Sequence, residues 1–193
     1  MFSAKTVSVL AKRWYNGNRK NPDTREQGAI ILGNILILVG SGRREGNTEL
    51  LARELARGAE GAQVEILPLA GLQVAPCLGC DTCMQRPDHS CVQKDDMQMI
   101  CDKLAWADGV VMASPLYFAG ISAQLKAVLD RLHSPIKDSF HFKKIALLMT
   151  AGSPNPASFA SVSLQYETLV RHFKLESVGT LLVNGMHGKG DVE

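Results

Sequence analysis

A loop rich in glycine and polar side chains, Gly40-Ser-Gly-Arg-Arg-Glu-Gly-Asn-Thr48, follows an apolar run and precedes a helix-like pattern. Glycines let such a backbone curl until its N–H groups converge on an anion, and the dipole of the following helix favours negative charge. Ser41, Asn47 and Thr48 add side-chain donors, and Arg43 adds a positive charge. The pattern therefore predicts a phosphate-binding loop.

Other loops share part of this pattern. A triphosphate-binding Walker A loop is excluded, because Asn47 stands where that loop needs a lysine. A dinucleotide-binding Rossmann loop stays open, since Gly40, Gly42 and Gly46 approximate its glycine spacing and Glu65 ends the next apolar run. A tight strand-to-helix turn without a ligand is also open, although polar and charged residues at the helix start favour anion binding.

Four cysteines follow in a short segment with the spacing Cys77-x-x-Cys80-x-x-Cys83-x7-Cys91. Four thiolates this close in sequence are able to ligate a [4Fe–4S] cluster from one loop. Zinc bound by four cysteines is a chemical alternative, and so are four reduced thiols that bind nothing. Cys101 falls on the apolar face of a predicted helix and is expected to be an inert core thiol.

A third candidate is Pro115-Leu-Tyr-Phe118, which follows a buried strand-like run. It offers apolar and aromatic surface to a planar ring, with backbone N–H groups available to the polar edge of that ring. The alternative is that Tyr117 and Phe118 only pack beneath a surface loop. Both interpretations place this loop at the end of a strand.

The rest of the chain alternates strand and helix patterns. Apolar runs predict strands at 30–39, 63–67, 109–113, 144–150 and 178–183, and continuous apolar strands are typical of a parallel sheet buried on both faces. Helical spacing of apolar residues predicts helices from Asn47 as N-cap, over 97–107, over 121–132 and over 159–173. The implied fold is α/β, with an open parallel sheet and right-handed crossovers.

This topology brings three loops together. Ligands of open parallel sheets bind at the carboxyl ends of the strands, and the loops 40–47, 114–120 and 151–157 all leave the predicted sheet at that edge. The cysteine segment leaves from the same edge after the second strand. We therefore expect it to lie beside the ligand.

Composition sets further bounds. With 21 Lys and Arg against 19 Asp and Glu, a net charge of +2 and no long apolar run, the sequence indicates neither a nucleic-acid partner nor a membrane span. The clustered cysteines and the absence of a secretory signal favour a reducing, cytoplasmic location. Residues 1–28 carry six basic and two acidic side chains, and we expect a poorly ordered basic extension, with a mitochondrial targeting peptide as the alternative.

Two of these motifs resemble a known family. Gly40-Ser-x-Arg-x-x-Gly-Asn-Thr-x-x-Leu51 is similar to the FMN-phosphate loop of the NADPH-dependent FMN reductase superfamily. The stretch from Ser114-Pro-Leu-Tyr-Phe118 to Asp130-Arg131 resembles the isoalloxazine loop and following helix of that superfamily, and Thr150-Ala-Gly-Ser153 resembles its third flavin loop. The cysteine motif resembles that of the iron–sulfur flavoproteins within it.

The resemblance implies a flavodoxin-like three-layer sandwich over residues 29–193, with a five-stranded parallel sheet of order 2-1-3-4-5. It implies FMN as cofactor and places His187 near the edge of the active site. The residues expected to bind FMN are Ser41, Arg43, Gly46, Asn47, Thr48, Pro115, Leu116, Tyr117, Phe118, Ala151, Gly152 and Ser153. Cys77, Cys80, Cys83 and Cys91 are the expected ligands of a [4Fe–4S] cluster, and no general acid or base is assigned.

The function implied is an NAD(P)H-dependent oxidoreductase of the flavin reductase type. Hydride from NAD(P)H as cosubstrate would reach flavin N5, and electrons would pass to a small-molecule or protein acceptor. Since flavin sites in this superfamily are often completed by a neighbouring subunit, we expect a homodimer or higher homo-oligomer. The alternative is a non-enzymatic iron–sulfur flavoprotein that carries electrons between proteins.

Overall fold

The protein is built on one parallel sheet of five strands. The computed structural model describes residues 32–59, 61–132 and 140–192. The strands are ordered β2-β1-β3-β4-β5 and every neighbouring pair is parallel, which confirms the predicted order and the flavodoxin-like fold. The strand bounds are β1 (Leu32–Val39), β2 (Ala62–Pro68), β3 (Gly109–Pro115), β4 (Lys144–Thr150) and β5 (Glu176–Val183).

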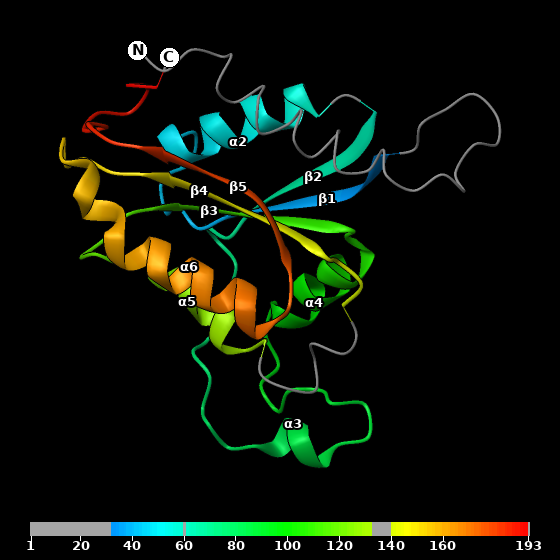
Figure 1. The fold of residues 1–193 in the computed structure, drawn as a ribbon. Coiled ribbons are helices and arrows are strands. Elements are labelled where there is room, and N and C mark those ends of the chain that lie inside the picture. Colours follow the sequence, from blue (N-terminus) through cyan, green and yellow to red (C-terminus); the bar gives the residue numbers. More distant parts are fainter. Residues whose placement is uncertain (1–31, 60, 133–139, 193) are drawn as a thin grey trace.

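Helices cover both faces of this sheet, as Figure 1 shows. One face carries α2 (Asn47–Gly58). The other carries α4 (Met97–Trp106), α5 (Ala123–Asp130) and α6 (Ala160–His172). The 3-10 turn η4 (Pro156–Phe159) leads directly into α6. The short helix α3 (Thr82–Gln85) lies in the cysteine segment, which projects from the α4–α5–α6 layer.

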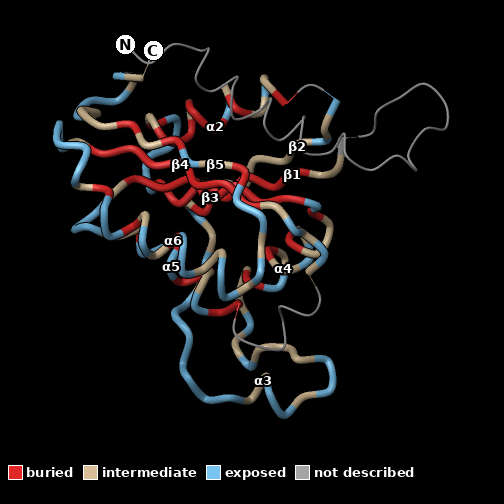
Figure 2. The backbone as a smooth tube through the Cα atoms, viewed as in Figure 1, coloured by how far each residue is buried: buried red, intermediate tan, exposed pale blue. Residues whose placement is uncertain are grey.

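The alternation of strand side chains divides the core into two layers. On β1, Ile35, Ile37 and Val39 pack towards α2, whereas Leu36 and Leu38 pack towards α4 and α5. All five are at most 1% exposed, because both faces of a central parallel strand are covered. Residues of the central strands β1, β3 and β4 are mostly buried, whereas the edge strands are partly exposed and the cysteine segment is half-buried or exposed (Figure 2).

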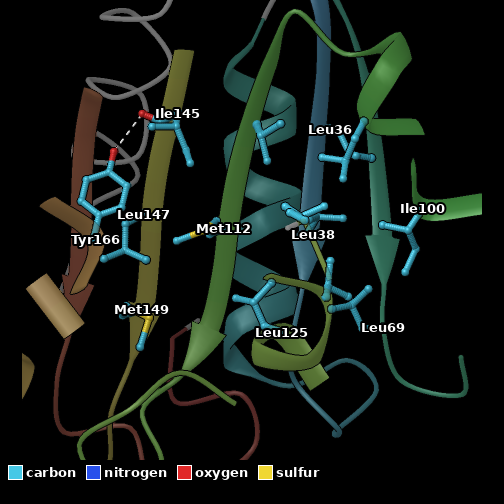
Figure 3. Packing of buried hydrophobic residues seen from close by; sticks show 14 of the residues in the cluster. Leu36, Leu38, Leu69, Ile100, Met112, Leu125, Ile145, Leu147, Met149 and Tyr166 are labelled. Carbon is cyan, nitrogen blue, oxygen red and sulfur yellow. Dashed lines mark hydrogen bonds between the residues drawn. The ribbon is translucent and has the colours of Figure 1, made fainter. Parts of the chain in front are cut away.

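The larger layer lies under α4, α5 and α6 (Figure 3). Its only polar group among the side chains labelled there is the phenol of Tyr166, which donates to the carbonyl of Ile145 over 2.9 Å and contacts the Ser177 hydroxyl over 2.8 Å. These bonds satisfy a group that burial would otherwise destabilise. They join α6 to β4 and β5.

Several boundaries differ from the predictions. Helix α5 ends at Asp130 rather than 132, and the predicted fourth helix begins with η4, since Pro156 occupies its first position. The N-cap of α2 is Gly46, not Asn47, whose side chain is used elsewhere. The predicted basic extension at residues 1–28 lies outside the described residues.

Candidate functional site

The loop after β1 turns sharply into α2. Glu45 has a φ of 52°, and its N–H donates over 2.7 Å to the carboxylate of Glu49, the third residue of α2. Glu49 is only 7% exposed and also accepts from Arg53, so it holds the turn closed in the manner of a capping box. Ser41 Oγ adds a second brace by accepting from the N–H of Arg43 over 3.1 Å.

The start of α2 points its free N–H groups towards the end of the sheet. For the N–H groups of Asn47 and Thr48, no hydrogen bond is found within the described residues, as expected for the first positions of a helix. The hydroxyls of Thr48 and Thr150 lie 2.8 Å apart and are both buried, so the first turn of α2 is joined to the end of β4. This arrangement offers donors to an anion.

The side chain of Asn47 binds a segment far away in the sequence, a contact that the sequence did not indicate. Its Nδ2 donates to the carbonyl of Gly188 over 2.7 Å, and its Oδ1 accepts from the N–H of Gly190 over 2.9 Å. Asn47 therefore holds the segment after β5 against the phosphate loop. One of the two Nδ2 hydrogens is used in this contact, and the other takes no part in either bond.

The loop after β3 is a strained hairpin. Tyr117 and Gly120 exchange two backbone hydrogen bonds of 2.9 Å, and the residues between them, Phe118 and Ala119, have φ values of 45° and 62°. Two successive non-glycine residues at positive φ are unusual, and such strain concentrates at ligand sites. Ser114 closes the base of this loop, because its hydroxyl accepts from the N–H of Ser122 and donates to the carbonyl of Pro115.

The loops after β4 and β5 run together. Met186 donates through its N–H to the carbonyl of Ala151 over 2.8 Å, and Gly185 donates to Ser153 over 3.1 Å. A Cβ on Gly152 would lie 3.4 Å from Nδ1 of His187, so the His187 ring packs on this glycine. The third predicted loop thus has a fourth loop beside it.

These four loops enclose one pocket of about 230 Å³ at the carboxyl edge of the sheet. Ten of the twelve residues predicted to bind FMN line it: Ser41, Arg43, Gly46, Asn47, Thr48, Pro115, Leu116, Tyr117, Ala151 and Gly152. Phe118 and Ser153 are not among its lining residues. Phe118 is fully exposed because its positive φ directs the side chain into solvent, and Ser153 is exposed and accepts from the N–H of Asn155.

Residues after β5 complete the pocket and were largely missed from the sequence. Met186, His187, Gly188 and Lys189 line it together with Thr150. Only His187 was placed near this edge beforehand. The signal available was the polar, glycine-rich stretch Asn184–Asp191 directly after the last strand, which is where a loop of the carboxyl edge must lie.

The cysteine segment lies elsewhere. Cys77, Cys80, Cys83 and Cys91 line one cavity of about 260 Å³, which also touches Asp130 at the end of α5. This cavity shares no lining residue with the four-loop pocket. The aromatic loop leads into the other end of α5, and an eight-residue helix spans about 12 Å. Within one chain the cysteine cavity is therefore separate from the pocket and lies at the opposite end of α5 from the aromatic loop.

The thiols of this cavity are free and do not converge. All five cysteines are unpaired, and Cys77 and Cys80 are exposed. Within residues 32–59, 61–132 and 140–192, no three His, Cys, Asp or Glu side chains are arranged to hold a metal ion. In kind and number the four thiols fit a [4Fe–4S] cluster, but the sulfurs would have to be regrouped to ligate one. Nδ1 of His89 donates to the carbonyl of Cys83 over 3.1 Å.

A family model decides between the flavin and dinucleotide interpretations. Residues 34–175 match the model of the NADPH-dependent FMN reductases, and this stretch includes the first three loops and all the cysteines. The chain belongs to this family. The match supports a flavoprotein rather than a dinucleotide-binding Rossmann enzyme.

Several relatives of this chain are named iron–sulfur flavoproteins. An iron–sulfur flavoprotein of Methanocaldococcus jannaschii is 40% identical over 111 residues, which cover 56% of each chain. Another, from Methanosarcina thermophila, is 36% identical over 121 residues, 60% of this chain and 62% of the relative. The chain thus aligns with little more than half the length of these relatives, and it falls in their branch of the family.

Solved structures agree in fold. The NAD(P)H:quinone oxidoreductase of Methanothermobacter marburgensis superposes with a TM-score of 0.61 at 16% identity, covering 82% of this chain and 89% of that one. The Trp repressor binding protein of Bacillus subtilis gives a TM-score of 0.59 at 20% identity, covering 82% and 88%. No helix in the described part of the chain is both long and apolar enough to cross a bilayer.

Proposed function

We propose that the four-loop pocket binds FMN and that the protein is an NAD(P)H-dependent oxidoreductase. The observation that carries this proposal is the convergence of the phosphate loop, the strained aromatic loop and the loop after β4 on one pocket. The groups that line the pocket are of the kinds that bind FMN. Free helix N–H groups meet a phosphate, and apolar side chains meet a flavin ring.

Each loop has a distinct task in this proposal. The first turn of α2, with Ser41 and Arg43, binds the phosphate, and Lys189 adds positive charge across the pocket. Leu116 and Tyr117 would offer apolar surface to the ring, and the loop 150–152 would offer backbone groups to its polar edge. Bound FMN supplies hydride acceptance from NAD(P)H. The chain itself positions the ring and limits access of water.

The aromatic loop supports a homodimer. Phe118 is fully exposed and Tyr117 is 48% exposed, while the backbone beneath them is strained. An exposed aromatic pair beside a cofactor pocket is typical of a contact surface. We expect a dimer or higher oligomer by light scattering at micromolar concentration with FMN present, and a monomer there would contradict this part of the proposal.

A second candidate function rests on the cysteines. Four thiols lining a single cavity favour a [4Fe–4S] cluster and an electron carrier that serves a protein partner, as the name of the relatives suggests. Free thiols throughout the described chain also support a reducing, cytoplasmic compartment. Such a carrier would bind FMN in the same pocket but would oxidise NAD(P)H very slowly unless a reductase were added.

One set of measurements on the full chain separates these functions. Flavin fluorescence during titration with FMN tests the pocket, and unchanged fluorescence would overturn both candidates. Anaerobic oxidation of NADH or NADPH with an artificial acceptor supports the enzyme. FMN binding and about four irons per chain, without pyridine-nucleotide turnover, would support the carrier instead.

A further inference from the structure

The four-cysteine segment has a closed neck, formed by Gln73–Ala75 on one side and Asp95–Asp96 on the other. The N–H of Gln73 donates to the carboxylate of Asp96 over 2.7 Å, and the N–H of Asp96 donates back to the carbonyl of Gln73 over 3.0 Å. The N–H of Ala75 donates to the carboxylate of Asp95 over 3.0 Å. The two ends of segment 76–94 are therefore held side by side, and all four cysteines lie beyond them.

Arg131 joins this neck to α5. It is the C-cap of that helix, and its side chain is only 2% exposed. Nη1 donates to the carboxylate of Asp95 over 2.5 Å and to the carbonyl of Ala75 over 3.4 Å, so that it contacts both sides of the neck. Burial alone would raise the pKa of Asp95, but hydrogen bonds from Arg131 and two backbone N–H groups outweigh it and lower that pKa. The pair is thus ionised in the folded protein.

The same guanidinium borders a cavity that Cys91 also lines. Arg131, Asp95 and Cys91 line this cavity of about 450 Å³. Burial would lower the pKa of Arg131, but the hydrogen bond to Asp95 and the charges of Cys91 and Asp95 more than offset this and raise the pKa. Nε is buried and has no hydrogen-bond partner among the described residues, so the group retains donor capacity.

Helix α5 connects this contact to the cofactor pocket. At its other end Ser122 is the N-cap, accepting from the N–H of Leu125, and it is bonded to Ser114 at the base of the aromatic loop. One short helix therefore holds the aromatic loop at its start and the neck of the cysteine segment at its end. The neck is therefore held one helix length away from the aromatic loop.

We propose that Arg131 is a positioning residue for the four-cysteine site: it holds the neck to α5 and so fixes the two ends of the segment that carries Cys77, Cys80, Cys83 and Cys91. This inference rests on the proposed binding of a cluster by these cysteines. A cluster held by four thiolates carries negative charge, and a buried guanidinium beside one sulfur stabilises the reduced form most. Arg131 therefore raises the reduction potential of the site as well as ordering it.

The test compares Arg131→Gln with wild-type protein and with Lys126→Gln. Lys126 pairs with Asp130 on the exposed face of α5, so its variant removes a charge from the same helix without touching the neck. Because Asp130 also borders the cysteine cavity, this variant is the control for hydrogen exchange and FMN affinity only. Because losing one partner of a buried ion pair destabilises a fold, the double variant Arg131→Gln/Asp95→Asn and the conservative Arg131→Lys are measured alongside. All are full-length chains.

The first readout needs no cluster. Hydrogen exchange of the FMN-loaded protein should quicken over residues 73–97 in Arg131→Gln and in the double variant, and not in Lys126→Gln. The second readout is iron uptake with ferrous iron and sulfide under anaerobic conditions. Loss of an outer contact typically weakens metal binding by roughly 10- to 100-fold, and we expect that range for Arg131→Gln. FMN affinity should be unchanged.

The third readout is the reduction potential of the fraction that retains a cluster. It should be lower in Arg131→Gln and partly restored in Arg131→Lys, which a purely structural role would not produce. Unchanged exchange in Arg131→Gln, or faster exchange with iron uptake and potential both unchanged, would overturn the inference. Failure of the wild type to take up iron, with FMN bound, would overturn the cluster and this inference together. Faster exchange would then show only that Arg131 holds the neck.

Discussion

The side-chain amide of Asn47 and the backbone carbonyl of Gly188 are joined by a hydrogen bond of 2.7 Å across 141 positions of the chain. The N–H of Gly190 returns a bond of 2.9 Å to the same side chain. The first residue of α2 thereby holds the loop after β5 in place. That loop contributes His187 and Lys189 to the pocket, so one asparagine connects the phosphate end of the site to its far wall.

Replacing Asn47 by alanine should weaken both the fold and the cofactor site. Two hydrogen bonds at about 0.5–1.5 kcal/mol each predict a loss of about 1–3 kcal/mol in the free energy of unfolding, measured by urea denaturation. The loop after β5 is released at the same time, so FMN affinity should fall in a fluorescence titration. Gln63→Ala on the exposed side of β2 is the matched control. Equal FMN affinity in both variants would show that the loop after β5 does not contribute to binding.

Gly40 and Gly42 should respond differently to the same substitution. A Cβ on Gly40 would lie 2.5 Å from Ser122 Oγ and 2.8 Å from Leu125 Cβ, both fully buried, whereas on Gly42 it would meet only Gln124 Nε2 at 3.6 Å. Gly40→Ala should lower the free energy of unfolding by about 1–3 kcal/mol, the cost of overpacking, and displace the start of α5. Gly42→Ala should be nearly neutral by thermal denaturation. Similar losses in both variants would contradict the packing explanation.

The strand and helix patterns predicted most of the fold, but they did not predict a close contact between two elements. Apolar runs such as 35–39 predict a strand buried on both faces because the spacing of apolar residues is itself the signal. Gly40 was expected to let the loop curl, but its space is taken by Ser122 and Leu125 from α5. That contact depends on how β1 and α5 meet, which no local pattern encodes.

In the candidate site, too, local patterns predicted the position of the loops but not the contacts between distant residues. All twelve predicted residues belong to segments whose position follows from the parallel topology, and ten of them line the pocket. Phe118 does not line it, and the positive φ at that position is something that sequence does not reveal for a bulky residue. Arg131 was passed over because its partners, Ala75 and Asp95, are 56 and 36 positions away.

Tyr166 should give the fold a pH dependence in the alkaline range. Burial raises its pKa although the hydrogen bond to Ser177 acts in the opposite direction. The unfolded chain has a tyrosine pKa of about 10, so its contribution to stability is complete below that pH. It is lost as the pH rises through the higher pKa of the folded state. Tyr166→Phe should cost about 1–2 kcal/mol at pH 7, and the difference from wild type should shrink above pH 10 in urea titrations. A constant difference from pH 7 to 11 would contradict the assignment.

The cysteines should differ in their rates of alkylation. The hydroxyl of Thr82, 3.3 Å from the Cys80 sulfur, lowers the pKa of that exposed thiol. Burial, helped by the charge of Asp102, raises the pKa of Cys101 to about 11, which leaves about 0.1% of it as thiolate at pH 8. Iodoacetamide followed by peptide mass mapping should therefore modify Cys80 first and Cys101 last. Thr82→Ala should slow the reaction at Cys80 and leave the rate at Cys101 unchanged.

The same measurement tests what the four cysteines bind. After incubation with ferrous iron and sulfide without oxygen, Cys77, Cys80, Cys83 and Cys91 should be protected together, since thiols that ligate a metal lose their nucleophilicity. Cys101 should react as before, because it lies outside the cavity of the four. Protection by zinc alone at equal concentration would favour a zinc site. If neither metal protects any of them, the four are free thiols, and FMN in the four-loop pocket remains the single cofactor of the proposed oxidoreductase.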